Sequence, residues 1–131
     1  MATRILMIAA VLVAACTPSE RPELTCQKRL VQVRDGSGSE ADAKDPFQAK
    51  AYAALDLSGC TPQQRATIAR LAELARQLPI LTERNNEAAT GNNPSAHNAA
   101  FQKMNDTLIQ LDDLEQGAKA DLETMLTKPA D

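Results

Sequence analysis

The fold of this chain follows from residues 93–127, NPSAHNAAFQKMNDTLIQLDDLEQGAKADLETMLT, in which apolar side chains recur at alternating steps of four and three. This spacing predicts one helix of about 30 residues with a single stripe along it. Asn93 or Ser95 is suited to cap its start, and Pro129 marks its limit. The predicted stripe consists of His97, Phe101, Met104, Leu108, Leu111, Glu115, Ala118, Leu122 and Met125.

A second amphipathic helix precedes it. Thr61-Pro62-Gln63-Gln64 matches a capping box with proline at the first helical position, so a helix begins there. Pro79 falls inside the apolar pattern, which predicts a kink with continuation to about Asn86. Residues 87–95 then form a break rich in Asn and Gly, so the two helices should pack as an antiparallel hairpin. The apolar stripe of this helix consists of Ile68, Leu71, Leu74, Ala75, Leu78 and Leu81.

Two weaker helical segments lie upstream. Residues 23–34 fit the spacing of a helix and also of a strand, and we favour the helix. Asp45-Pro46 supplies an N-cap and a first-turn proline, and Gly59 is placed to end the helix that follows. Residues 35–44 form a net acidic connector between the two. The sequence therefore predicts one all-α domain over residues 23–131, a small bundle of three to four helices.

The first fifteen residues have the composition of an export signal. Arg4 precedes an unbroken apolar run over residues 5–15, which is shorter than the roughly 20 residues that a membrane span needs. Val13-Ala14-Ala15-Cys16 resembles the lipobox of bacterial lipoproteins. The resemblance implies that residues 1–15 are removed, that Cys16 is acylated and sits in the bilayer, and that residues 16–22 form a short tether. Thr17, rather than aspartate, implies the outer membrane, facing the periplasm.

The lipoprotein resemblance bears on the two remaining cysteines, Cys26 and Cys60. It implies an oxidising compartment, where disulfides persist, and two cysteines allow only one internal pairing. Closing this loop would contribute roughly 3–4 kcal/mol on the chain-entropy model. A redox or metal-binding pair would have the closer Cys-x-x-Cys spacing. We therefore expect a disulfide that staples the bundle.

Composition argues against nucleic acid, metal and cofactor binding. The chain has 14 basic and 17 acidic residues, a net charge of −3, so it offers no basic surface to phosphates. His97 is the single imidazole and lies at a stripe position, where a packing role is expected. Asp112, Asp113 and Glu115 cannot converge on one ion from a regular helix, because consecutive residues point about 100° apart. We therefore expect no enzyme activity, metal or cofactor.

One position interrupts the stripe. Glu115 replaces an apolar residue, and Gly117 follows it at a cost of about 1 kcal/mol relative to alanine. This weak point is interpreted as a hinge, as a place where a partner's basic residue pairs with Glu115, or as a seam that is open to water. We expect a non-enzymatic binding module for another envelope protein, with candidate partner contacts at Leu74, Leu108 and Glu115.

Lipoproteins of similar plan serve as secretion or conjugation accessories, exclusion factors or inhibitors, and no residue selects among these roles. The alternative is a self-associating helical spacer of the envelope. The sequence leaves the oligomeric state open.

Overall fold

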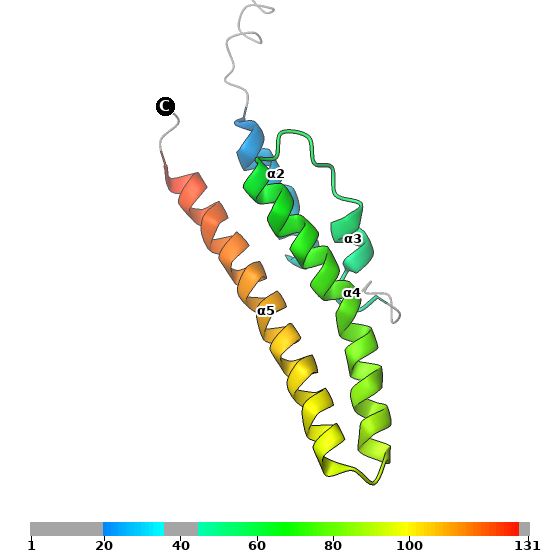
Figure 1. The fold of residues 1–131 in the computed structure, drawn as a ribbon. Helices are drawn as coiled ribbons and strands as arrows, with labels where there is room; N and C mark the ends of the chain where they lie inside the picture. The colour runs from blue at the N-terminus through cyan, green and yellow to red at the C-terminus, as the bar shows by residue number, and fades with distance from the viewer. Residues whose placement is uncertain (1–19, 36–44, 129–131) are drawn as a thin grey trace, which may run out of the picture.

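The computed structural model describes residues 20–35 and 45–128, in which the regular secondary structure is entirely helical. The helices are α2 (Pro22–Asp35), α3 (Ala49–Ala53), α4 (Pro62–Thr90) and α5 (Pro94–Thr127) (Figure 1). The all-α prediction is confirmed, and residues 23–34, which fit a helix or a strand by pattern, are helical. The expected signal peptide over residues 1–15 and Cys16 lie outside the described residues.

α4 and α5 form the predicted antiparallel hairpin, which runs the length of the molecule (Figure 1). The capping box at the start of α4 is confirmed. The Thr61 hydroxyl accepts a hydrogen bond from the amide of Gln64 at 3.1 Å, and the Gln64 side-chain oxygen accepts from the amide of Thr61 at 2.9 Å. Asn93 caps α5, since its side-chain oxygen accepts from the amide of Ala96 at 3.2 Å.

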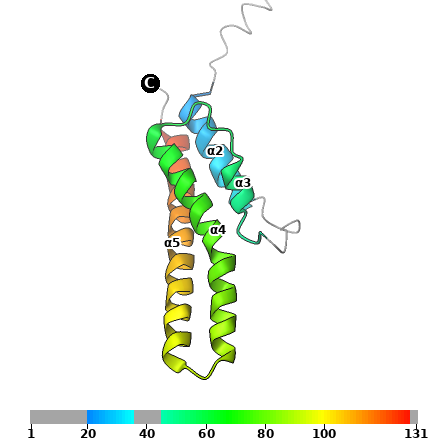
Figure 2. The same ribbon diagram turned by 45° about the vertical axis from the view of Figure 1, so that its right-hand side comes forward.

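Pro79 lies inside α4 without ending it. Its ring nitrogen has no hydrogen to donate to the carbonyl of Ala75, one turn earlier, and the ring crowds that carbonyl. Figures 1 and 2 show that the axis of α4 bends near its middle, as the predicted kink requires. α4 then continues to Thr90, beyond its predicted end near Asn86.

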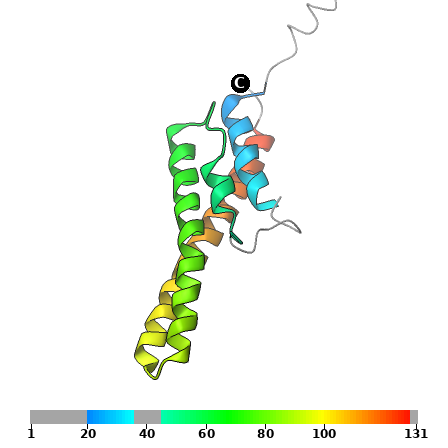
Figure 3. The same ribbon diagram turned by 90° about the vertical axis from the view of Figure 1, so that its right-hand side faces the viewer.

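The helices α2 and α3 cover only one half of the hairpin, the half that contains the start of α4 and the end of α5 (Figure 2). The other half projects beyond them and ends in the turn between α4 and α5 (Figure 3). We call residues 79–110 the distal half, because the main core cluster stops on either side of them. That cluster consists of Cys26, Leu30, Val31, Tyr52, Ile68, Leu71, Leu74, Ala75, Leu78, Leu111 and Ala118.

The predicted disulfide is confirmed. Cys26 and Cys60 are bonded with a Cα–Cα distance of 5.3 Å, which fastens the residue before the α4 cap to α2. Gly59 has a φ of 76°, and a Cβ there would lie 2.8 Å from Cβ of Pro22, so this position accepts only glycine without strain. Arg29 donates to two carbonyl oxygens of the same loop, those of Asp56 and Ser58, each at 3.1 Å.

The expectation of one helix from Pro46 toward Gly59 is wrong, because α3 spans only Ala49–Ala53. Asp45 does act as a cap, and its carboxylate accepts from the first two amides of α3 at 2.8 and 3.0 Å. However, Gln48 adopts a left-handed φ of 64°, which keeps the proline outside the helix. Beyond α3, the Asp56 carboxylate accepts from the amide two residues later at 2.9 Å, a local bond that competes with helix formation.

The length of α5 is as predicted, but its apolar stripe is only partly buried. Leu111 and Ala118 are buried, whereas Phe101 and Leu108 are 50% and 40% exposed. Thr107 takes the inward position beside Leu108, and its hydroxyl donates to a backbone carbonyl one turn earlier at 2.8 Å. An α-helix drifts by about 20° per heptad against a strict seven-residue repeat. A stripe with this repeat therefore rotates gradually away from a single partner helix, and part of it becomes exposed.

Candidate functional site

Of the three predicted partner contacts, only Leu108 is exposed. Leu74 is 1% exposed within the core cluster, so its prediction as a partner contact is wrong. A residue at an a/d-type position of a hairpin helix is buried by the opposite helix before any partner arrives. The side chain of Glu115 is only 15% exposed, and its contacts lie within the chain.

Glu115 is the centre of a polar cluster that joins three helices. The Tyr52 hydroxyl of α3 donates to its carboxylate at 2.6 Å, and the Arg34 guanidinium of α2 lies 3.5 Å from the other carboxylate oxygen. Arg34 also pairs with Asp112, one turn earlier on α5, at 3.1 Å. We call these four residues the Glu115 cluster.

The cluster revises the interpretation of Glu115 as a weak point. The carboxylate has a cationic partner and a phenol donor in its own chain, so it neither awaits a partner's basic residue nor lies open to water. Burial of Tyr52 raises the pKa of its phenol above the usual value, and the hydrogen bond to Glu115 is the second largest cause of this shift. Tyr52 and Arg34 escaped sequence reasoning because they lie 63 and 81 residues away from Glu115, where no local spacing links them.

A small groove lies beside the Glu115 cluster. It has a volume of about 220 Å³, and Leu108 forms part of its wall together with Phe47, which precedes α3. Arg34, Asp112 and Glu115 supply its charged rim. The groove thus presents apolar and charged groups side by side where the distal half begins.

Three exposed apolar residues of α5 lie on the distal half, from this groove toward the turn. Phe101 and Leu108 are seven residues apart and share one face of α5, and Ile109 is 50% exposed on the flank of that face. We call these three residues the distal strip. Exposed apolar side chains that form a contiguous patch are a feature of surfaces that other proteins cover.

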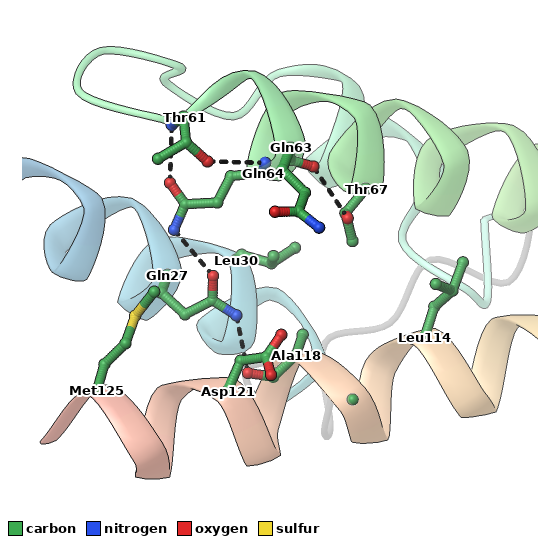
Figure 4. Close-up of a pocket in the computed structure, with 11 residues that line it drawn as sticks. Gln27, Leu30, Thr61, Gln63, Gln64, Thr67, Leu114, Ala118, Asp121 and Met125 are labelled. Atoms are coloured by element: carbon green, nitrogen blue, oxygen red, sulfur yellow. Dashed lines mark hydrogen bonds between the residues drawn. The ribbon is translucent and has the colours of Figure 1, made fainter. Parts of the chain in front are cut away.

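A larger groove of about 460 Å³ lies at the opposite end of the hairpin, between the start of α4 and the end of α5, with α2 as its floor (Figure 4). The buried amide of Gln27 donates to the carbonyl of Ala118 at 2.8 Å. Gln64 donates to the side-chain oxygen of Gln27 at 3.0 Å and to the carbonyl of Glu23 at 2.8 Å. The pair therefore fixes α2 against both long helices.

This polar pair has a structural role. The side-chain amide of Gln64 accepts the capping-box hydrogen bond from Thr61 and donates to Glu23 and Gln27 of α2. The same side chain therefore caps α4 and anchors α2. Gly117 lines the same groove, and no atom other than its chain neighbours and the surrounding backbone of α5 lies within 4 Å of the Cβ that it lacks. The absence of a side chain there widens the groove without any close packing that would require glycine.

The acidic residues of α5 do not assemble into an ion site. Asp112 pairs with Arg34, Glu115 accepts from Tyr52, and Asp113 is exposed. Across residues 20–35 and 45–128, no three His, Cys, Asp or Glu side chains are placed to hold a metal ion. His97 lies half-buried in the first turn of α5, at the far end of the distal half.

Comparison with known proteins adds no further assignment. The chain matches no protein-family model, and no curated protein or solved structure is significantly similar to it. Among the helices that the structure describes, none combines the length and apolar character needed to cross a membrane.

Proposed function

We propose that the chain is a bacterial lipoprotein, anchored in a membrane of the cell envelope through an acylated Cys16, whose helical body is a non-enzymatic binding module for another envelope protein. The lipobox-like residues 13–16 and the apolar leader before them support the anchor. The oxidised Cys26–Cys60 pair is consistent with an oxidising compartment.

The observation that carries the binding role is the distal strip. Its three apolar side chains belong to the distal half of α5, and Leu108 also lines the groove beside the Glu115 cluster. Burial of apolar side chains is the main favourable contribution to the free energy of protein association. Aromatic residues such as Phe101 are enriched at the centre of protein–protein interfaces. The distal strip is therefore the surface assigned to the partner.

Site-specific photo-crosslinking in the native cell tests this assignment. A photoreactive residue is placed at Phe101 or Leu108, with two controls at matched positions. Leu74 is the same residue type as Leu108 but is buried, and Gln116 is exposed on α5 outside the strip. We expect one dominant envelope protein to be captured from positions 101 and 108 and from neither control.

Two outcomes would contradict the proposal. Capture of the same proteins from Gln116 as from Leu108 would mean that the strip has no preference for a partner. Capture of only a second copy of this chain would favour the self-associating spacer. In that case the association must use the distal strip rather than the α5 seam, because Leu111 and Ala118 are already buried within the chain.

A further inference from the structure

Both ends of the described body lie together, at the end of the hairpin opposite its turn (Figure 1). The guanidinium of Arg21, directly before α2, donates to the carbonyl of Met125 in the last turns of α5 at 2.9 Å. The side chain of Glu20 bonds to Thr25 at 2.8 Å, so residues 20–22, which were expected to belong to the tether, are part of the folded body.

This end carries exposed apolar side chains of its own. Leu126, in the last turn of α5, is 56% exposed, and Leu57, two residues before the Gly59 that lies against Pro22, is 37% exposed. Leu57 stands on a fixed loop, because Arg29 holds the carbonyl oxygens on either side of it and the disulfide at Cys60 closes the loop. The two leucines are separate from the distal strip, which lies on the other half of the hairpin.

The link to Cys16 is short. Four peptide units separate Cys16 from Glu20, and a fully extended chain of that length spans at most about 14 Å. The headgroup layer of a bilayer is itself roughly 5–7 Å deep on each side. If Cys16 carries acyl chains, the end of the body that contains Arg21 cannot move far from the membrane surface.

From these three observations we infer that this end of the bundle rests on the lipid surface, with Leu57 and Leu126 entering the boundary between headgroups and acyl chains. The inference rests on the proposed lipid anchor. The acidic residues Glu20, Asp121 and Glu123 and the basic residues Arg21 and Lys128 lie at this end, so it has no cationic excess. The contact therefore depends on the leucines and is insensitive to salt, unlike that of a basic amphipathic helix.

The inferred orientation sets the height of the partner surface. α5 has 34 residues, so the hairpin reaches about 50 Å from the membrane when it stands on this end. Along the same axis, Leu108 lies about 28 Å and Phe101 about 39 Å from Thr127. The binding module thus presents its distal strip well above the headgroups, to a partner that projects into the same space.

Tryptophan quenching tests this orientation, since the chain contains no tryptophan. The full mature lipoprotein is purified from membranes as Leu126→Trp, Leu57→Trp and, as the control, Phe101→Trp. Each substitution replaces an exposed apolar residue, and circular dichroism verifies the fold. The proteins are incorporated into vesicles of phosphatidylethanolamine and phosphatidylglycerol with brominated acyl chains. We expect the emission from positions 126 and 57 to lose most of its intensity at low and high salt, and the emission from position 101 to stay unchanged.

The outcomes separate this inference from the proposed anchor. If the protein floats with the vesicles but the Leu126→Trp variant is not quenched, the anchor stands and the inference is wrong, because the body then hangs free of the surface. Equal quenching of Leu126→Trp and Phe101→Trp would mean that the hairpin lies flat, which also overturns it. If the wild-type protein lacks acyl chains on Cys16 and fails to float, both the anchor and the inference fail.

Discussion

The hydrogen bond between Tyr52 and Glu115 should be among the strongest polar interactions in the fold. The phenol is 2% exposed, the donor–acceptor distance is 2.6 Å, and the acceptor side chain is 15% exposed. A hydrogen bond to a charged group contributes about 1.5–3 kcal/mol. We therefore predict a coupling free energy of about 1.5–3 kcal/mol in a double-mutant cycle of Tyr52→Phe and Glu115→Ala, because the cycle removes the separate effect of the Arg34 ion pair.

Urea unfolding followed by circular dichroism supplies the four free energies of unfolding in this cycle. Glu73 and Arg76 form a matched control, since they make a close side-chain pair on α4 in which both side chains are largely exposed. Water screens such a pair, so its coupling should be clearly smaller. A Tyr52–Glu115 coupling no larger than that of the control would refute the account of Glu115 as the point that joins α2, α3 and α5.

Three further predictions concern the tyrosine, the glycines and the disulfide. Because the pKa of Tyr52 is raised in the folded protein, the tyrosine of the unfolded chain ionises first, near pH 10. The contribution of Tyr52 to the free energy of unfolding is therefore complete below pH 10 and is lost as the pH rises further. Phenolate absorbance of this single tyrosine, with and without denaturant, measures the difference between the two pKa values. Gly117→Ala should stabilise the protein by about 1 kcal/mol, since a helical Cβ there meets open space, whereas Gly59→Ala should destabilise it because of its φ of 76°; thermal unfolding of the two variants compares them. Reduction of the Cys26–Cys60 disulfide, whose cysteines are 34 residues apart, should lower the free energy of unfolding by roughly 3–4 kcal/mol. Urea titrations with and without reductant measure this loss, and coinciding unfolding curves would contradict it.

The features predicted correctly from sequence are those encoded by neighbouring residues. The Thr61–Gln64 capping box and the Asn93 cap each join residues three positions apart, and their bonds form as predicted. The pairing of Cys26 with Cys60 followed from assigning the third cysteine to the lipobox, which left a single partner for each. Helix existence and type were therefore accessible from local chemistry and periodicity.

The features that sequence reasoning missed depend on contacts across the fold. α3 is short because Gln48 turns left-handed and because Arg29, far away on α2, holds the carbonyl of Asp56 outside a helix. Glu115 breaks the apolar pattern of α5, yet it is satisfied by residues from two other helices. Such pairings carry no spacing signal in the chain.

The exposure of Leu108 has a different origin. A pattern of four and three identifies an apolar stripe but does not say where along the helix the stripe leaves its partner. In α5, Thr107 takes the inward position beside Leu108, so the same stripe is core at Leu111 and surface at Leu108. The candidate partner surface is therefore a consequence of how α5 packs within the bundle, which only the assembled fold reveals.

An intact-mass measurement on the protein extracted from the membranes of its own cells bears on the whole proposal. We predict a chain that begins at Cys16 and carries a thioether-linked diacylglycerol together with an acyl group on its new amino terminus. A free thiol at position 16, or a chain that still contains residues 1–15, would contradict the lipid anchor and the orientation inferred from it.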